Sequence, residues 1–432
     1  MSKEKIVVGI DIGSAKICTI IASVSKEGQI TVIGVSTVPS AGIKKGVVVD
    51  IDDSVDSISM SLEGAERMSG YAVSSAFISV GGNHIASLNS HGVVAISNPT
   101  GEITEEDVAR VTEAARAISI PSSREIIHVL PKSFIVDSQE GVHDPVGMSG
   151  VRLEVETHII SGVSTSMRNL VKCVQQAGVD VEDLVFSALA SSYATLSDTE
   201  KELGVILVDM GAGTTDVAIF IEGAIAYSSV LPIGGRNITN DLAIGLRTSL
   251  EDAEKIKLHL SSKETGRPKF KETNPTESKS DVKEEKRESK EDEIDVSDLN
   301  LGELKTISKK FLIDGIIKPR LKEIMTLVAL EIKKSGFTNS LPAGIVLTGG
   351  ASETVGIKEI SKEALNLPVR IAKPEGVSGL IDEIQSPAYS TSVGLIIFGS
   401  EVNKSKVLPA VGITQMKGLV GKVISWIKSL IP

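Results

Sequence analysis

Two stretches of the chain share one pattern of apolar and polar positions. Residues 6–22 read IVVGIDIGSAKICTIIA and residues 204–221 read GVILVDMGAGTTDVAIFI, so each run of apolar β-formers is interrupted by Asp-x-Gly. A short break that contains glycine predicts a β-hairpin, because glycine accepts the positive φ of a tight turn. One such hairpin is consistent with a purely structural role, whereas its repetition in one chain favours a duplicated phosphate-binding fold.

The residue types at the two breaks are suited to phosphate and magnesium. Backbone N–H groups of a tight turn and nearby hydroxyls are donors for an anion. A carboxylate repels phosphate, so we expect Asp11 and Asp209 to reach it through Mg²⁺, which usually keeps several of its own waters. The predicted nucleotide-binding residues of the two hairpins are Asp11, Gly13, Ser14, Ala15, Lys16, Asp209, Gly211, Ala212, Gly213, Thr214, Thr215 and Asp216.

A third apolar run ends in paired glycines. Residues 344–352 read GIVLTGGAS, and Gly349 and Gly350 allow a flat base or ribose to lie directly against backbone. Taken alone, this element is consistent with an ordinary turn at the end of a strand. The competing nucleotide motifs, Gly-x-x-x-x-Gly-Lys-Ser/Thr and a Gly-x-Gly-x-x-Gly after a strand, do not occur in the sequence. The order of two phosphate loops and an adenosine loop resembles the actin-like ATPase superfamily.

Further segments carry a closer resemblance within that superfamily. They are HVLPKSFIVDSQEGVHDPVGMSGVRLEVETHIISG (128–162), KGVVVDID (45–52), LASSYATL (189–196), LPIGGRNITNDLA (231–243) and EDAEKIK (251–257). Over most of its length the chain is similar to the FtsA family of bacterial cell-division proteins. The resemblance implies ATP and Mg²⁺ as cofactors. It also implies that Gly234 and Gly235 lie near the phosphates, that Glu254 and Lys257 face the ribose or adenine, and that Gly349, Gly350 and Ala351 close the adenosine pocket.

The resemblance also implies an architecture. The expected fold is α/β of the actin-like, ribonuclease H-like type: a duplicated fold with the nucleotide cleft between two lobes, a small inserted 1C subdomain and a C-terminal amphipathic helix. The implied parts are a first lobe (1–82 with 163–202), the 1C subdomain (83–162), a second lobe (203–240 with 315–399), a 2B subdomain (241–314), a linker (400–416) and a membrane-targeting helix (417–432).

Two of these parts have a distinctive pattern of their own. The 1C segment has short β-rich runs and one amphipathic helix that begins at Thr104, where Thr-Glu-Glu-Asp is a helix start signal. Its family role is contact between subunits. The 2B segment contains residues 261–299, which are so rich in charge, Ser, Thr and Pro that they predict a flexible loop. Helical apolar spacing follows over residues 304–334, where Lys309, Lys310, Lys318 and Arg320 are candidates to meet an acidic peptide.

The last sixteen residues, KGLVGKVISWIKSLIP, predict an amphipathic helix. At 100° per residue the apolar side chains occupy one arc and the glycines, serines and lysines the other. An apolar face with lysines and a Trp at its edge is typical of a helix that lies in an anionic membrane interface, although docking on the protein core is the alternative. The predicted membrane-binding residues are Leu419, Val420, Lys422, Val423, Ile424, Trp426, Ile427, Lys428, Leu430 and Ile431.

Composition narrows the class of protein. The net charge of the 432 residues is −11, which disfavours broad contact with nucleic acid. No stretch approaches the ~20 apolar residues of a membrane span. Cys18 and Cys173 lie in apolar patterns and are expected to be buried and reduced, and the six histidines have no metal-ligand spacing.

The leading hypothesis is a membrane-tethering adaptor that binds ATP and polymerises at the division site. By resemblance its partners are itself, the C-terminal peptide of FtsZ, later membrane proteins of the division machinery and the cytoplasmic face of the cell membrane. An actin-fold sugar kinase and a chaperone-type ATPase are the alternatives, and a pilus-assembly relative of FtsA is a nearer one, against which residues 128–162 argue. Hydrolysis is expected to be slow or negligible, because relatives often carry Glu or Gln before LASSYATL to orient water, and this chain has Ser187 there.

Overall fold

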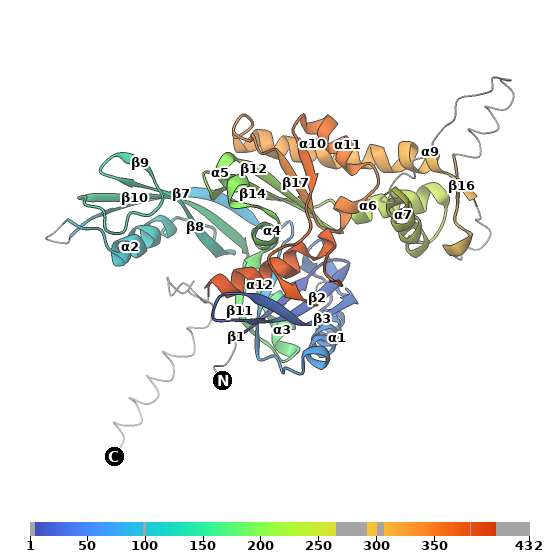
Figure 1. Ribbon diagram of the computed structural model, residues 1–432, viewed down its shortest axis with the longest axis horizontal. Coiled ribbons are helices and arrows are strands. Elements are labelled where there is room, and N and C mark those ends of the chain that lie inside the picture. Colours follow the sequence, from blue (N-terminus) through green and yellow to red (C-terminus); the bar gives the residue numbers. More distant parts are fainter. Residues whose placement is uncertain (1–4, 98–100, 265–291, 300–305, 381, 403–432) are drawn as a thin grey trace, which may run out of the picture.

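The computed structural model of the protein describes residues 5–97, 101–264, 292–299, 306–380 and 382–402. Two sheets that share a five-strand topology form its centre. The first-lobe sheet has the order β11-β6-β1-β2-β3-β19 and the second-lobe sheet the order β14-β13-β12-β17-β18 (Figure 1). From β3 to β11 and from β14 to β18, two antiparallel pairings are followed by two parallel ones, and the first-lobe sheet adds β19 parallel to β3. This repeated order confirms the predicted duplication.

The strands of both sheets coincide with the apolar runs of the sequence. The first-lobe strands are β1 (Lys5–Ile12), β2 (Lys16–Val24), β3 (Ile30–Pro39), β6 (Ser75–Val80), β11 (Asp180–Phe186) and β19 (Ser378–Gly379). The second-lobe strands are β12 (Val205–Met210), β13 (Thr215–Ile221), β14 (Ala224–Leu231), β17 (Ile345–Thr348) and β18 (Val369–Ile371). Central strands such as β12 are buried at every position, as expected for a sheet covered on both faces.

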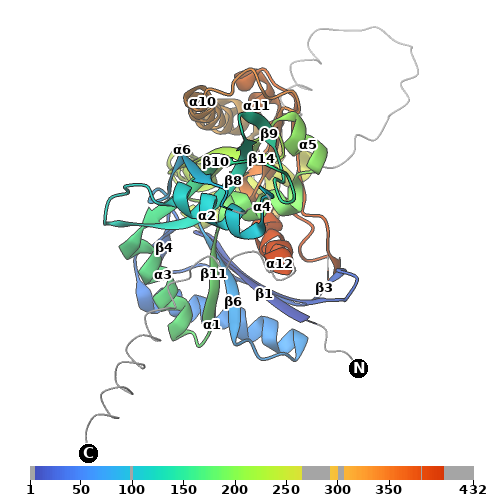
Figure 2. The same cartoon turned by 90° about the vertical axis from the view of Figure 1, so that its left-hand side faces the viewer.

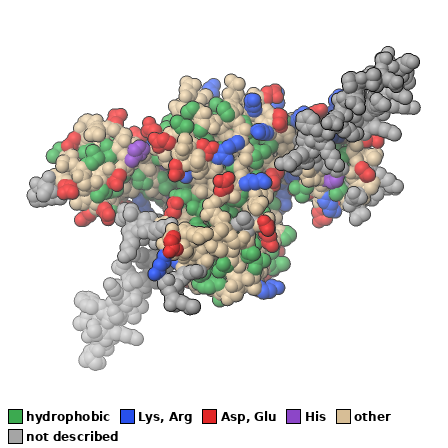
Figure 3. All heavy atoms as spheres, in the orientation of Figure 1, with side chains coloured by type: hydrophobic (Ala, Val, Ile, Leu, Met, Phe, Trp, Pro, Cys, Tyr) green, Lys and Arg blue, Asp and Glu red, His purple; other side chains and the backbone are tan. Residues whose placement is uncertain are grey.

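Helices pack on both sheets and extend the lobes. The helices beside the first-lobe sheet are α1 (Ile51–Ser69), α3 (Ser164–Gln176), α4 (Ser187–Thr195) and α12 (Ser390–Val402). The other helices of the two lobes are α5 (Asp198–Leu203), α6 (Gly235–Leu246), α7 (Leu250–Glu264), α10 (Lys318–Ser335) and α11 (Ile357–Leu365). The lobes also contain the short helical turns η3 (Gly350–Glu353) and η4 (Pro387–Tyr389) and the short strands β4 (Ile43–Lys44) and β5 (Val47–Val48). Figure 3 shows acidic and basic side chains interspersed on one face of this assembly.

The inserted subdomain has its own sheet and its own apolar core. Its strands, in the order β7-β10-β8-β9, are β7 (Ala86–Ala95), β10 (Arg152–Val163), β8 (Arg124–Val136) and β9 (Gln139–Val142). Helix α2 (Glu105–Arg116) covers the sheet and begins at Thr104, whose hydroxyl accepts from the Asp107 N–H, so the predicted helix start is confirmed. The insert projects sideways from the lobes (Figures 1 and 2).

A buried histidine fastens the insert to the second lobe. The two ring nitrogens of His158 on β10 lie 2.7 Å from Asn89 Oδ1 and 2.9 Å from Ser228 Oγ on β14. Ser87 on β7 donates to the Ser228 carbonyl at 2.7 Å. Burial lowers the pKa of His158 to about 4, so the ring is neutral near pH 7.

The 2B region differs from the sequence prediction at three points. Thr306–Ser308 is a strand, β16, paired with β15 (Glu293–Asp295), so the helix begins at Lys309 and not at Leu304. The segment predicted to be a flexible loop has ordered ends, because α7 continues to Glu264 and η1 (Ser297–Leu299) follows β15. Helix α9 (Lys309–Leu312) passes through a π-helical turn, η2 (Ile313–Ile317), into α10. The rest of the segment, 265–291, lies outside the described residues.

The C-terminal part of the predicted second lobe belongs to the first lobe. Strand β19 pairs with β3, and the apolar side chains of α12 join the first-lobe core against β1, β2 and β6. The prediction that the second lobe extends to residue 399 is therefore wrong. An internal duplication does not show where the chain returns from the second lobe to the first. Residues 400–402 continue α12, and the predicted linker and membrane helix beyond them (403–432) lie outside the described residues.

Helices α12 and α4 cross at a glycine. A Cβ at Gly394 would lie 1.9 Å from the Ala190 carbonyl oxygen. Alanine normally stabilises a helix interior by about 1 kcal/mol relative to glycine. Here overpacking dominates, so the helices can approach this closely only with glycine at the crossing.

We predict that Gly394→Ala lowers the free energy of unfolding by about 2 kcal/mol or more, measured by urea denaturation. Gly315→Ala is the matched control, because its nearest neighbouring atom would be 3.7 Å away. This control is expected to be neutral or slightly stabilising. Equal stabilisation by both substitutions would contradict the close crossing.

Candidate functional site

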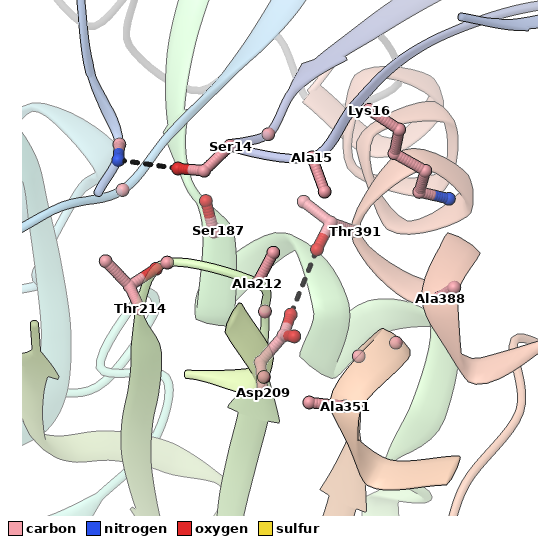
Figure 4. A pocket seen from close by; sticks show the side chains of 18 of the residues that line it. Ser14, Ala15, Lys16, Ser187, Asp209, Ala212, Thr214, Ala351, Ala388 and Thr391 are labelled. Carbon is pink, nitrogen blue, oxygen red and sulfur yellow. Dashed lines mark hydrogen bonds between the residues drawn. The ribbon is translucent and has the colours of Figure 1, made fainter. Parts of the chain in front are cut away.

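A cavity of about 370 Å³ lies between the two lobes, at the turns of both Asp-x-Gly hairpins. Its size is within the usual range of small-molecule sites, roughly 300–1,000 Å³. Figure 4 shows Ser14 and Ala15 of the first hairpin facing Asp209, Ala212 and Thr214 of the second across this space. The lining residues predicted from sequence are Asp11, Gly13, Ser14, Ala15, Lys16, Asp209, Gly211, Ala212, Gly213, Thr214, Asp216, Gly235, Glu254, Lys257, Gly349, Gly350 and Ala351.

The two hairpin turns have the same hydrogen-bond geometry. The Gly13 N–H donates to the Lys16 carbonyl at 3.0 Å, and the Gly211 N–H donates to the Thr214 carbonyl at 2.9 Å. The turns also lie close to each other, since a Cβ at Gly213 would be 2.9 Å from Ser14 Oγ. Ser14 Oγ in turn accepts from the Gly46 N–H at 3.0 Å (Figure 4). The two hairpin turns therefore form one structural unit, and their binding of phosphate stays a prediction.

Hydroxyl groups hold the two predicted magnesium-facing carboxylates. Asp11 accepts from Ser79 at 2.8 Å and from Ser392 at 3.0 Å. Asp209 accepts from Thr391 at 3.0 Å and also from Ser191. Burial raises the pKa of Asp11, and it raises the pKa of Asp209 to about 6 although the hydroxyls oppose the shift. A cation that enters the cavity would therefore stabilise the charged form of both carboxylates.

Two further charged groups line the cavity without a hydrogen-bond partner among the described residues. They are Asp216 Oδ1 and Lys16 Nζ, the latter lying 3.2 Å from the centroid of the Tyr389 ring. Burial, with the charges of Asp209 and Asp11 in addition, raises the pKa of Asp216 well above its ordinary value. Burial lowers the pKa of Lys16. Unpaired buried groups of both signs favour a ligand that carries both anionic and cationic parts.

The opposite end of the cavity is built by α6, α7 and the turn after β17. Lys257 Nζ donates to Glu254 at 2.7 Å and to Thr239 Oγ1 at 3.0 Å, which fixes both charged side chains at the cavity wall. Leu258 adds an exposed apolar side chain to the same wall. Gly349 has φ 81°, and a Cβ there would lie 2.3 Å from Asp209 Oδ1, so this turn requires glycine. The arrangement provides polar contacts beside a flat apolar surface.

Two predicted residues lie beside the cavity and do not line it. The Thr215 side chain is buried, and its hydroxyl donates to the Ile233 carbonyl at 2.8 Å. Gly234 lies behind Gly235, whose N–H donates to the Gly211 carbonyl at 2.9 Å. Both residues support the second loop from behind. The predicted ligand role of Thr215 is therefore corrected, because the alternation of a strand places its side chain in the core.

Ser187 lines the cavity as the first residue of α4 and not on a loop. A Cβ at Gly81 would lie 2.9 Å from Ser187 Oγ and 3.4 Å from Asp216 Oδ2, so both polar atoms face the same small space. A carboxyl group, that of Asp216, therefore lies near position 187 although the residue at that position carries none.

The sequence prediction missed other lining residues. They are Ile12, Gly46, Gly81, Leu258, Glu353, Ala388 and Thr391. Gly81 had a recognisable signal, because β6 ends in Gly81-Gly82 as β17 ends in Gly349-Gly350, at equivalent places of the two sheets. Thr391 had a weaker one, the polar run Ser-Thr-Ser at the start of an apolar helix. Ala388 and Glu353 had none.

The residues present fit a nucleotide polyphosphate with magnesium. Among the described residues, no three His, Cys, Asp or Glu side chains are placed to ligate one metal ion directly. Asp11 and Asp209 would instead hold a hydrated Mg²⁺ through its waters. Lys16 and the turn N–H groups would meet the phosphates, and the α6–α7 wall would meet the nucleoside. In the part of the chain that the structure describes, no helix has the length and apolarity needed to cross a bilayer.

The fold and the paired turns define an actin-like protein. Two solved structures share the fold. A PilM-PilN type IV pilus biogenesis complex has a TM-score of 0.63 at 16% identity, covering 93% of this chain and 99% of that one. The ethanolamine utilization protein EutJ from Carboxydothermus hydrogenoformans has a TM-score of 0.51 at 17% identity, covering 92% of this chain and 90% of that one.

The chain belongs to the FtsA family of cell-division proteins. The family profile "Cell division protein FtsA" matches residues 206–394, and "SHS2 domain inserted in FTSA" matches residues 82–161. Cell division protein FtsA from Pseudomonas aeruginosa is 42% identical over 91% of this chain and 89% of its own length. The protein of that name from Borreliella burgdorferi is 40% identical over 93% of this chain and 92% of its own length. The one from Bacillus subtilis is 39% identical over 92% of this chain and 84% of its own length.

We predict that Asp216→Asn stabilises the nucleotide-free protein by about 1–3 kcal/mol at pH 8, because it removes a buried carboxylate with an unpartnered oxygen. The pKa of Asp216 is raised in the folded state, so the unsubstituted protein loses stability as pH rises through that pKa. Asparagine does not titrate, and the difference should therefore be smaller at pH 5.

Thermal and urea denaturation at both pH values measure the effect. Asp56→Asn on the exposed face of α1 is the control, and is expected to be neutral at both. Destabilisation by Asp216→Asn at pH 8 would show that the folded protein favours the charged carboxylate.

Proposed function

We propose that this cell-division protein binds Mg²⁺·ATP between its lobes, assembles into polymers and holds FtsZ filaments at the cytoplasmic face of the cell membrane. The observation that carries the nucleotide site is the pair of matching turns facing one cavity, with Asp11 and Asp209 at their bases. FtsA family membership favours this adaptor role over a sugar kinase or a chaperone-type ATPase. Recruitment of later membrane proteins of the division machinery follows from the same role.

The proposed binding mode assigns a task to each group of residues. Turn N–H groups and Lys16 neutralise the phosphates, and the two aspartates orient the hydrated magnesium that offsets the remaining charge. Glu254 and Lys257 receive the ribose or adenine edge, while Gly349 to Ala351 and Leu258 form the flat wall. Bound nucleotide contacts both lobes at once, so it favours one arrangement of them for assembly.

Slow or negligible hydrolysis remains our proposal for the nucleotide cycle. Ser187 carries no charge and is a weak acceptor for a water proton compared with the carboxylate or amide of many relatives. Asp216 lies next to Ser187, but its raised pKa favours the protonated form, which cannot accept that proton. Nucleotide therefore serves mainly to hold a conformation.

A shallow groove on the 2B side is the proposed seat of the FtsZ C-terminal peptide. Its lining residues are Asp241, Ile244, Gly245, Gly315, Ile316, Pro319, Arg320 and Glu323. Ile244 is 76% exposed, which is unusual for an isoleucine next to a groove. Arg320 pairs with Asp241 at 2.5 Å, and Lys318 with Asp314 at 2.6 Å, so two of the four predicted basic contacts are already engaged within the chain.

Membrane attachment is proposed for residues 417–432, which lie outside the described part of the chain. A short helix with three lysines binds anionic lipid reversibly, and a polymer adds many such helices to one particle. Self-assembly therefore strengthens attachment without any new contact.

For ATP binding, we predict that Lys257→Met weakens the binding of a fluorescent ATP analogue by about tenfold or more in a fluorescence titration. The reason is that the buried ammonium group of Lys257 lies at the end of the cavity proposed for the nucleoside. Lys255→Met on the same helix is the matched control, since that lysine is exposed and pairs with Asp252. The control should stay within about twofold of the unsubstituted protein. Equal affinities of both variants would place the nucleoside elsewhere.

For membrane binding, we predict that Ile424→Gln weakens attachment to anionic vesicles by about tenfold or more, because one large apolar side chain no longer enters the interface. Ser425→Gln on the polar arc is the control and should have little effect. Co-sedimentation and the blue shift of Trp426 fluorescence measure attachment, and added FtsZ should co-sediment only with attached protein. A Trp426 spectrum that is blue-shifted without lipid and does not respond to it would show a tail docked on the core.

A further inference from the structure

Helix α12 begins with consecutive hydroxyl residues that each contact a different strand. Ser390 lies 2.6 Å from the Thr348 hydroxyl at the end of β17. Thr391 donates to Asp209 of β12 at 3.0 Å, and Ser392 donates to Asp11 of β1 at 3.0 Å. Figure 4 shows the Thr391 side chain pointing toward Asp209. One helical turn therefore reaches both lobes at the cavity.

The second donor of each carboxylate comes from another element. Ser79 of β6 holds Asp11, and Ser191 of α4 holds Asp209. Thr391 Oγ1 also lies 2.9 Å from Ser191 Oγ, which links α4 and α12 at this point. Through Thr391 and Ser392, the single helix α12 thus contacts both carboxylates. Adjacent residues of an α-helix are separated by a fixed rise and rotation.

The body of α12 cannot shift easily. Ser390 and Ser392 are buried, the apolar residues of the helix join the first-lobe core, and the glycine crossing holds it against α4. A displacement of either carboxylate would break a hydrogen bond to an ionised acceptor or open this packing. The separation of Asp11 and Asp209 is therefore tied to the helix.

We propose that Thr391 and Ser392 are positioning residues that set the separation of Asp11 and Asp209 for a hydrated Mg²⁺ bound with ATP. This inference rests on the proposed function of nucleotide binding. It assigns α12 a specific task at the site: its first turn presents one carboxylate from each lobe to the same ion. Ser390, which contacts no carboxylate, has no part in this task.

The test compares Thr391→Val, Ser392→Ala and the matched control Ser390→Ala in titrations of a fluorescent ATP analogue, with excess EDTA and over a series of Mg²⁺ concentrations. For Thr391→Val and Ser392→Ala, the Mg²⁺ concentration for half-maximal binding should rise about tenfold, equivalent to about 1.4 kcal/mol. Their affinity in EDTA should change less than about twofold. Ser390→Ala should behave as the unsubstituted protein, and Thr391→Ser should restore the normal Mg²⁺ requirement.

Other outcomes overturn the inference. An unchanged Mg²⁺ requirement, or an equal loss of affinity with Mg²⁺ and with EDTA, would show that the hydroxyls only satisfy buried acceptors. Ser392→Ala removes a single oxygen and decides the question if Thr391→Val does not fold. Failure of the unsubstituted protein to bind ATP would refute the proposed function itself, and this inference with it.

Discussion

Two carboxylates, those of Asp11 and Asp209, face one cavity at the junction of the lobes, and the elements around them are arranged to keep both there. Asp11 and Asp209 are like-charged groups largely removed from bulk solvent, so each carboxylate needs hydrogen-bond donors that belong to the fold. Hydroxyls from β6, α4 and α12 provide that compensation. The same desolvation makes a divalent cation favourable there. A site of this kind brings the two lobes to the same helix and the same ligand.

Five strands of each lobe share one topology, but the two halves differ in chemistry. In the first hairpin Asp11 pairs across the strands with Cys18, whereas in the second Asp209 pairs with Asp216. The second half therefore brings an additional carboxylate to the cavity, beside Ser187. The glycines that follow β6 and β17 also have different neighbours. Gly81 lies close to Ser187 and Asp216, whereas Gly349 lies close to Asp209. Two similar halves thus form one asymmetric site.

The appended parts surround this centre without entering it. The insert has a core of its own and meets the second lobe through a few buried polar contacts around His158. Helices α6 and α7 line one end of the cavity, and α6 also lines the exposed groove together with η2 and α10. Because α6 contributes to both surfaces, occupation of the cavity and of the groove involves one rigid element. The proposed adaptor role would use separate surfaces of this kind around one nucleotide site.

The duplication, the hairpins and most of the cavity lining were predictable from the amino-acid sequence, because tight turns with glycine and carboxylates depend on local backbone chemistry. It also predicted the start of α2, since a capping box is a local signal. Only the tertiary structure decided that Thr215 faces the core, that α12 belongs to the first lobe, and that Ser79, Ser191, Thr391 and Ser392 converge on two aspartates. These residues are distant in sequence, and a hydroxyl has no periodic signature. Their roles come from long-range packing, which no local pattern records.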